Sequence, residues 1–300
     1  MHYFNPLPLI LLCLTLMACA PTLQQSVPAS SEAPPNPPEK PISQAQANRV
    51  VALTSLSADI IGYLDASKLV GITGSRLFAQ DPRFQGLPIV SQGRTPPNLE
   101  KITALKPDLV IGATGFHDRT LARLKELGIN TLATQVGSWA DLEQQTRDLA
   151  AAIAADPTPL LQRLQACKAN APTQSPSTLV LVSQQPILAP NKTSWAGDLL
   201  TQFNAQNVAA DLQGESPTRG YITLSAERVL QANPDVMILV DTEPGVVEQL
   251  KSLPFWKQLK ATQTQQVHVL DYYGMVNPGS IEKIEQTCTQ LKRILAKSAG

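Results

Sequence analysis

The chain has 300 residues, enough to bury one large core or two cores of ordinary domain size. Lys and Arg total 24, as do Asp and Glu, so the formal net charge is zero. Nucleic acids are bound by a concentrated basic face, and this balanced composition therefore argues against nucleic acid as a partner.

The first twenty residues, MHYFNPLPLILLCLTLMACA, have the pattern of an export signal. The apolar run from Leu7 to Ala18 is too short to span a bilayer and fits a signal peptide of residues 1–18. Residues 16–19, LMAC, resemble a bacterial lipoprotein cleavage box, which implies that Cys19 is the lipidated first residue of the mature protein. A plain secretory signal with an incidental cysteine is the alternative.

A tether is expected over residues 19–47. This segment is rich in Pro, Ser and Gln and has almost no large apolar side chains. Such a composition cannot bury enough surface to offset chain entropy, so we expect a disordered connection. Together with an acylated Cys19, the tether would hold a soluble domain close to a membrane.

Alternating strands and helices begin at Arg49, an order typical of parallel α/β architecture. Residues 48–137 are predicted to form an N-terminal lobe. Ser57 is predicted to cap its first helix, because a serine hydroxyl can accept a first-turn N–H. The expected strands are Arg49–Leu53, Leu69–Thr73, Asp108–Gly112 and Thr131–Ala133, and the expected helices are Ala58–Leu64, a short helix around Glu100, and Thr120–Leu127.

A helical linker is predicted over residues 138–172, where the pattern shows no strand. Asp156 is its expected internal N-cap, with Pro157 in the following first turn. The predicted fold class is α/β, with two Rossmann-like lobes joined by a single long helix and a ligand cleft between the lobes. A C-terminal lobe follows at 173–300, with expected strands Thr178–Ser183, Asp235–Val240 and Gln266–Leu270 and expected helices Trp195–Phe203, Ser225–Ala232, Glu243–Lys251 and Ser280–Lys297.

One helix–strand unit occurs once in each lobe. LEKITALKPDLVI, residues 99–111, returns as AERVLQANPDVMIL at residues 226–239. In each copy a glutamate, Glu100 or Glu227, stands seven residues before a Pro-Asp pair. This duplication indicates two related lobes and favours a partner with two matching faces.

Three stretches, RVVALTSLSADIIGYLDASKLVGITG, PNLEKITALKPDLVIGATG and LSAERVLQANPDVMILV, resemble the helical-backbone class (class III, cluster A-II) of ABC-importer substrate-binding proteins. The resemblance covers about residues 48–297 and implies a cargo of ferric siderophore, vitamin B12 or haem. It also implies a lipid-anchored protein of the periplasm, or of the cell surface in a Gram-positive organism, that delivers cargo to an ABC permease dimer with its ATPase. We expect a monomer that needs no cofactor.

An enzyme is not expected. The sequence contains no G-x-S-x-G elbow, no G-x-x-x-x-G-K-[ST] phosphate loop and no G-x-G-x-x-G fingerprint. An alternative of another class is a non-transporting adaptor that inherited the fold.

Glu100 and Glu227 each lie in the first turn of an expected helix, where the helix dipole favours a carboxylate. One interpretation is helix-end electrostatics alone. Another is a catalytic pair, although glycosidases need two carboxylates within about 10 Å. The resemblance implies a third: in the vitamin B12-binding relative, one surface glutamate per lobe docks into arginine pockets of the two permease subunits. We predict permease docking for both residues.

The ligand cleft is expected at the carboxyl ends of the strands, where open α/β sheets bind their ligands. The loops there carry arginines, aromatic rings and one histidine, which suit a bulky, partly anionic metal chelate. The predicted ligand-binding residues are Ser55, Arg94, Phe116, His117, Trp195, Arg219, Tyr221 and Tyr273.

Some of these roles are implied by resemblance. The string GRTPPNLE, residues 93–100, is similar to the segment of the hydroxamate-siderophore binding protein in which an arginine contacts the chelate, which implies that role for Arg94. Tyr273 matches a ligand-contacting tyrosine of that relative, and Phe116 falls near the place of another. Arg219 stands where the relative has a tryptophan and suggests a more anionic cargo. A ferric siderophore is thus the expected cargo, with cobalamin or haem as the alternative.

Several assignments have structural alternatives. Arg94 also fits a solvated loop or a pair with Asp81, and Trp195 also fits the core. Tyr272 and Tyr273 point to opposite faces if the chain there is extended, so only one would reach the cleft.

Histidines and cysteines leave further alternatives open. His117 keeps haem in consideration, whereas zinc and manganese sites need three or four ligands, so we expect no direct metal site. Cys167 and Cys288 lie in expected helices of the mature domain. An oxidising compartment favours their pairing, but the sequence does not give their separation.

Overall fold

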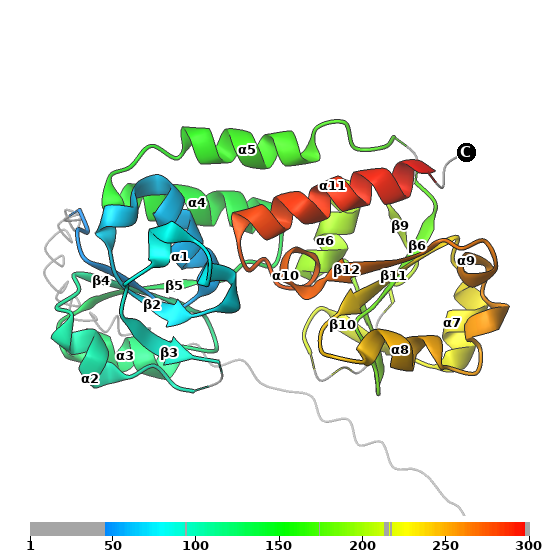
Figure 1. The fold of residues 1–300 in the computed structure, drawn as a ribbon, viewed down its shortest axis with the longest axis horizontal. Coiled ribbons are helices and arrows are strands. Elements are labelled where there is room, and N and C mark those ends of the chain that lie inside the picture. The colour runs from blue at the N-terminus through cyan, green and yellow to red at the C-terminus, as the bar shows by residue number, and fades with distance from the viewer. Residues whose placement is uncertain (1–45, 94, 174, 213–215, 217, 298–300) are drawn as a thin grey trace, which may run out of the picture. The chain divides into compact units, whose positions relative to one another are not determined.

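The structure is a computed structural model that describes residues 46–93, 95–173, 175–212, 216 and 218–297 (Figure 1). The expected signal peptide, Cys19, all but the last two residues of the tether, and Arg94 lie outside the described residues. Within the described part of the chain, no helix is both long enough and apolar enough to cross a bilayer.

The first lobe is built on a five-stranded parallel sheet of order β3-β2-β1-β4-β5. The central strand is fully buried, as expected for a parallel sheet whose two faces are covered. In chain order its elements are β1 (Val50–Ala52), α1 (Ser55–Asp65), η1 (Ala66–Lys68), β2 (Leu69–Gly74), η2 (Arg76–Phe78), η3 (Pro82–Phe84), β3 (Ile89–Gln92), α2 (Leu99–Ala104), β4 (Leu109–Ala113), α3 (Asp118–Glu126) and β5 (Asn130–Thr134).

Helix α1 begins three residues before the predicted start. Thr54, not Ser57, is its N-cap: Thr54 has an extended backbone, and its hydroxyl accepts the Ser57 N–H at 3.2 Å. Ser57 is fully buried inside the first turn. The prediction of Ser57 as the cap is therefore wrong, because Thr54, three residues earlier, adopts the extended conformation that a capping residue requires.

The second lobe carries a four-stranded parallel sheet of order β12-β11-β6-β9. A small antiparallel sheet of order β10-β8-β7 stands beside it. The elements are β6 (Ser177–Leu181), β7 (Ser183–Gln184), β8 (Ile187–Pro190), α6 (Trp195–Gln202), β9 (Gln206–Asn207), β10 (Tyr221–Leu224), α7 (Ala226–Ala232), β11 (Val236–Asp241), α8 (Val246–Lys251), η4 (Trp256–Gln258), α9 (Lys260–Gln263), β12 (Val267–Asp271) and α10 (Tyr272–Met275).

Strands β8 and β10 lie in segments for which the sequence predicts neither a strand nor a helix. Ile222 of β10 pairs with Ala189 of β8, far away in the chain, and both side chains are buried. Because β8 and β10 are not consecutive in the chain, no turn sequence between them indicates that they pair. The α/β class with parallel sheets is nevertheless confirmed.

The connection predicted as a single long helix is two helices, α4 (Trp139–Ile153) and α5 (Thr158–Lys168). Ala154, with a left-handed φ of 53°, ends α4. Pro157 rather than Asp156 occupies the N-cap position of α5, although Asp156 still accepts the Thr158 N–H at 2.9 Å. The break lets α5 pack on both α4 and the last helix, α11 (Ile281–Lys297).

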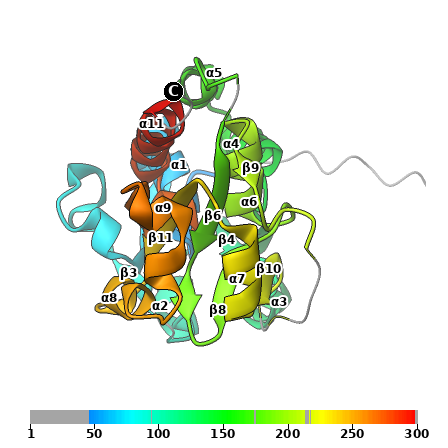
Figure 2. The same cartoon turned by 90° about the vertical axis from the view of Figure 1, so that its right-hand side faces the viewer.

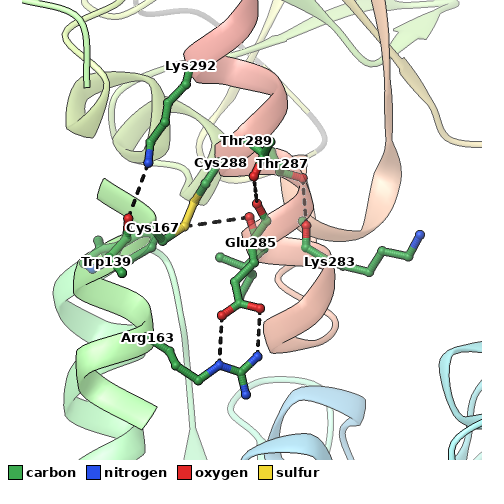
Figure 3. The surroundings of a disulfide bond; sticks show 12 residues. Trp139, Arg163, Cys167, Lys283, Glu285, Thr287, Cys288, Thr289 and Lys292 are labelled. Atoms are coloured by element: carbon green, nitrogen blue, oxygen red, sulfur yellow. Dashed lines mark hydrogen bonds and ion pairs between the residues drawn. A yellow bond between two sulfur atoms is a disulfide. The ribbon is translucent and has the colours of Figure 1, made fainter. Parts of the chain in front are cut away.

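Figures 1 and 2 show α4, α5 and α11 gathered along one side of both sheets. Cys167 of α5 and Cys288 of α11 form a disulfide, with their Cα atoms 5.7 Å apart. Close by, Arg163 donates to both carboxylate oxygens of Glu285 at 3.0 and 2.8 Å (Figure 3). These links fasten the linker helix to the C-terminal helix.

The repeated Pro-Asp pair has the same structural role in both lobes. Asp108 accepts the backbone N–H groups of Asn48 and Arg49, at 2.8 and 2.9 Å, just before β1. Asp235 accepts the backbone N–H and the hydroxyl of Ser177, at 3.1 and 2.7 Å, at the start of β6. Each aspartate thus secures the beginning of the neighbouring parallel strand.

Candidate functional site

One cavity, called the main pocket, has a volume of about 480 Å³. It lies at the carboxyl ends of β1, β2, β4 and β5 and is closed by the segment after β12, so both lobes contribute to it. None of the described residues that line it has a carboxylate, ammonium or guanidinium group. Its polar lining consists of Thr54, Ser55, Thr73, Ser75, Thr114, His117, Thr134, Gln135, Gln145, Tyr273 and Asn277.

A second pocket of about 420 Å³ shares Gln135 and Val136 with the main pocket. Its chemistry differs, because Lys192, Arg219 and Asp141 line it. Lys192 forms an ion pair with Asp211, with a nitrogen–oxygen distance of 2.5 Å. Arg219 is exposed and has no ion pair with any described residue. The second pocket therefore offers a guanidinium beside a main pocket whose described lining carries no carboxylate, ammonium or guanidinium group.

His117 is held as a neutral imidazole at the main pocket. It is 5% exposed, and its Nδ1 accepts the Ala113 backbone N–H at 2.9 Å. Burial lowers the pKa of this imidazole, and the nearby Asp118 only partly opposes the shift. Because Nδ1 accepts a hydrogen bond, the proton of the neutral ring lies on Nε2. Phe116, with its ring edge-on to His117, is 66% exposed and also lines the main pocket.

Tyr273 stands in a tightly held turn after β12. Asp271 accepts its backbone N–H at 2.8 Å, and the guanidinium carbon of Arg76, from the first lobe, lies 5.0 Å from its ring centre. Tyr273 lines the main pocket and also a third pocket of about 310 Å³. Tyr272 instead packs against the hydrophobic core.

Trp195 belongs to the core and to the second pocket at once. It is 4% exposed and stacks on Trp139 of α4, with ring centres 6.0 Å apart. Its indole N–H donates to the carbonyl of Gly274 at 2.8 Å, next to Tyr273. Tyr221 also lines the second pocket, where burial raises the pKa of its phenol.

The structure thus brings the described members of the predicted ligand set to two adjoining pockets. Ser55, Phe116, His117 and Tyr273 line the main pocket, and Trp195, Arg219 and Tyr221 line the second pocket. Arg94 lies outside the described residues, although its neighbour Gly93 lines the main pocket.

Sequence reasoning missed two parts of the lining. Thr134 ends β5 and Gln135 and Val136 follow it, so the same strand-end rule that selected the other loops would have found them. Gln145 lies in the middle of α4, and no pattern in the sequence distinguishes it from the adjacent Gln144.

The two predicted docking glutamates are exposed in the first turns of α2 and α7. Asn98 caps the helix of Glu100, and Ser225 caps the helix of Glu227. Neither carboxylate forms an ion pair within the described part of the chain. Both are therefore available to a partner, one from each lobe.

A metal site is not apparent in the described ranges: no three or more His, Cys, Asp or Glu side chains are grouped so as to hold an ion.

Comparison with known proteins points to one family. A family model described as "Periplasmic binding protein" matches residues 50–273. The vitamin B12-binding protein of Vibrio cholerae is 28% identical over 206 residues, covering 65% of this chain and 72% of the relative. An uncharacterised ABC transporter substrate-binding lipoprotein of Bacillus subtilis is 22% identical over 260 residues, covering 79% and 78%.

Solved structures share the fold. The crystal structure of the periplasmic vitamin B12 binding protein of Vibrio cholerae superposes with a TM-score of 0.66 at 24% identity, covering 84% of this chain and 98% of that one.

Proposed function

Because the chain belongs to the periplasmic binding protein family, we propose that it is the substrate-binding protein of an ABC importer and that its cargo is a corrinoid of the vitamin B12 type. The observation that carries the cargo is the lining of the main pocket. Its described residues offer hydroxyl, amide and aromatic groups and no charged side chain. A corrinoid presents neutral carboxamide side chains around an apolar ring, which such a lining can solvate.

The adjoining second pocket supports a cargo larger than the main pocket alone. The two cavities of about 480 and 420 Å³ meet at Gln135 and Val136. Cobalamin also carries one phosphodiester, and the exposed guanidinium of Arg219 in the second pocket is suited to an anionic oxygen. Neutral and anionic parts of one cargo thus have separate partners.

A ferric siderophore is the second candidate. Arg219 and Lys192 in the second pocket favour it, since guanidinium and ammonium groups pair with the oxygens of an anionic chelate. Arg94, if it contacts the chelate as expected, would add a further cation. Haem is a weaker alternative that rests on the Nε2 atom of His117, because Nδ1 already accepts a hydrogen bond from Ala113.

Delivery would use the two exposed glutamates. Glu100 and Glu227 occupy equivalent positions in the repeated unit and carry no intramolecular ion pair among the described residues. A permease dimer with one arginine pocket per subunit would receive them as a matched pair. Lipidation at Cys19 would hold the protein at a membrane facing the periplasm.

The test is a titration of the purified protein by calorimetry and tryptophan quenching. The panel contains cyanocobalamin, haemin, ferric hydroxamate, citrate-type and catecholate siderophores, and the iron-free siderophores. Sub-micromolar binding of cyanocobalamin alone is the expected result. Preference for a ferric siderophore over its iron-free form would replace the corrinoid as cargo. If none of these compounds binds, a non-transporting adaptor would be favoured.

A further inference from the structure

Gln145 is a buried polar side chain at the floor of the main pocket. It comes from helix α4 of the linker, whereas the rest of the polar floor follows strand ends, and it is only 6% exposed. Its Nε2 donates to the hydroxyl of Ser57 at 3.0 Å. No described residue donates to its Oε1. In this orientation Gln145 offers the pocket its Oε1 as a hydrogen-bond acceptor.

The same floor contains the N-terminus of α1. Thr54 accepts the Ser57 N–H through its hydroxyl and the Ala58 N–H through its carbonyl. The first-turn N–H groups of Ser55 and Leu56 have no acceptor among the described residues, and both residues line the pocket. The first turn of this 11-residue helix has no acidic side chain to compete for them.

Donors and an acceptor thus stand next to one another. Thr54 links them, because its hydroxyl bonds to the same Ser57 oxygen, at 2.8 Å, that Gln145 bonds at 3.0 Å. A ligand group that satisfies both sides must accept hydrogen bonds with one atom and donate them with a neighbouring atom. A primary carboxamide has this arrangement, with its carbonyl oxygen beside its NH₂.

We propose that the floor of the main pocket is a carboxamide subsite, in which the N–H groups of Ser55 and Leu56 bind the amide oxygen and Gln145 Oε1 binds the amide NH₂. This inference rests on the proposed corrinoid cargo and states that the protein binds one of its carboxamide side chains at this place. A carboxylate in the same place would satisfy the helix N–H groups, but it would set an anionic oxygen against Gln145 Oε1. The subsite therefore selects an amide over the corresponding acid.

The first experiment compares Gln145→Met with Gln144→Met. The substitutions are chemically identical and adjacent, but Gln144 is exposed and bonds to Asp148 on the outer face of α4. Affinities are measured for cyanocobalamin and for its monocarboxylic derivatives, each with one amide hydrolysed to an acid.

In the wild type and in Gln144→Met, one derivative should bind at least about tenfold more weakly than cyanocobalamin. In Gln145→Met, cyanocobalamin should lose about three- to tenfold in affinity, and the discrimination against that derivative should shrink to within about threefold. Equal discrimination in Gln145→Met and Gln144→Met would overturn the subsite.

The second experiment tests the helix N–H directly and does not depend on Gln145. Ser55 is the first residue of α1, where proline is accepted, and Thr54 before it is already extended, as a residue preceding proline must be. Ser55→Pro removes the N–H and the hydroxyl, whereas Ser55→Ala removes the hydroxyl alone.

Ser55→Pro should bind cyanocobalamin about three- to tenfold more weakly than Ser55→Ala. Equal affinity of the two variants would exclude the Ser55 N–H from the subsite and overturn the proposal. A wild-type protein that does not bind cyanocobalamin would overturn the proposed cargo and the subsite together. Binding that is indifferent to Gln145 and to the Ser55 N–H would overturn the subsite alone.

Discussion

The carboxylate of Asp59 accepts a hydrogen bond of 2.7 Å from the backbone N–H of Ile281, a residue 222 positions later in the chain. Asp59 lies on α1 of the first lobe and Ile281 opens α11, so one buried carboxylate joins the two. Its other oxygen pairs with Arg83 at 2.8 Å. Burial raises the pKa of Asp59, while the Ile281 N–H and Arg83 oppose the shift.

Replacing Asp59 by alanine should lower the free energy of unfolding by about 3 kcal/mol, because it leaves the Ile281 N–H unpaired and removes one of the two carboxylates that Arg83 contacts. Urea denaturation of Asp59→Ala and Asp59→Asn measures the change, and the asparagine variant should lose less. Asp241→Ala is the control, since Asp241 is exposed, and should stay within about 0.5 kcal/mol. A loss in Asp59→Ala no larger than in the control would contradict the assignment.

Acidification should destabilise the protein through His117. Its pKa in the folded state lies below the ordinary value of 6.5, so between these two values the unfolded chain binds more protons. Stability is therefore full above pH 6.5 and falls as the pH drops below it, by at most about 1.4 kcal/mol per pH unit. In His117→Asn, the new amide can still accept the Ala113 N–H but does not titrate. The loss of stability below pH 6.5 that comes from His117 should therefore be absent. An identical pH profile of the two proteins in urea denaturation would exclude His117 as its source.

The disulfide between Cys167 and Cys288 should contribute about 2–4 kcal/mol to stability. Dithiothreitol should therefore lower the melting temperature of the wild type. The double variant with Cys167→Ser and Cys288→Ser should melt at the temperature of the reduced wild type and should not respond to the reductant. A wild type whose melting is unaffected by complete reduction would show that the bond does not stabilise the fold.

Reversing the charge of both docking glutamates should separate binding from transport. Glu100→Arg combined with Glu227→Arg should reduce importer-dependent uptake by at least about tenfold while cargo affinity stays unchanged. Glu282→Arg is the matched control, because Glu282 is also an exposed first-turn glutamate but lies on α11. Weaker cargo binding in the double variant would point to a role in the cleft instead of docking.

Gly274 should tolerate alanine poorly. Its φ of 99° strains any side chain, and an added Cβ would lie 2.4 Å from the carbonyl oxygen of Lys283 and from the hydroxyl of Thr287. We expect Gly274→Ala to lose more than about 1 kcal/mol of stability and to weaken cyanocobalamin binding by displacing Tyr273. Gly86→Ala shares the positive φ but meets no atom within 4 Å. Equal losses in the two variants would show that the crowding is unimportant.

Sequence patterns predicted most helices and parallel strands, because each of these elements is specified by residues that are close together in the chain. The helix–strand unit that contains Glu100 and its copy at Glu227 were recognisable from spacing alone, as were the buried parallel strands. The pairing of β10 with β8 was not, because it joins two segments that are not consecutive in the chain. The internal helix start at Asp156 and Pro157 was visible in the linker sequence, but the left-handed backbone of Ala154, which ends α4, has no signature in a run of alanines.

The sequence predicted only part of the candidate site, because some of its residues are brought there by contacts between distant segments. The strand-end rule selected Ser55, Phe116 and Tyr273, which all line the main pocket. It could not select Gln145, because a side chain from the middle of a helix enters the site only through the packing of α4 on α1. The expected anionic cargo rested on Arg94, which lies outside the described residues, and on Arg219, which lines the second pocket rather than the main pocket.

The bond between Asp59 and Ile281 also has a consequence for the order of assembly. A ribosome makes residue 59 long before residue 281, and domains of this size begin to fold while synthesis or export continues. Until α11 has been made and has packed against α1, the Asp59 carboxylate lacks its backbone donor, the Ile281 N–H. The face of α1 that α11 covers stays exposed during that time. The first lobe is therefore completed by the last helix of the chain. Contacts of such long sequence separation slow folding, so the first lobe becomes fully packed only after the whole chain has been made.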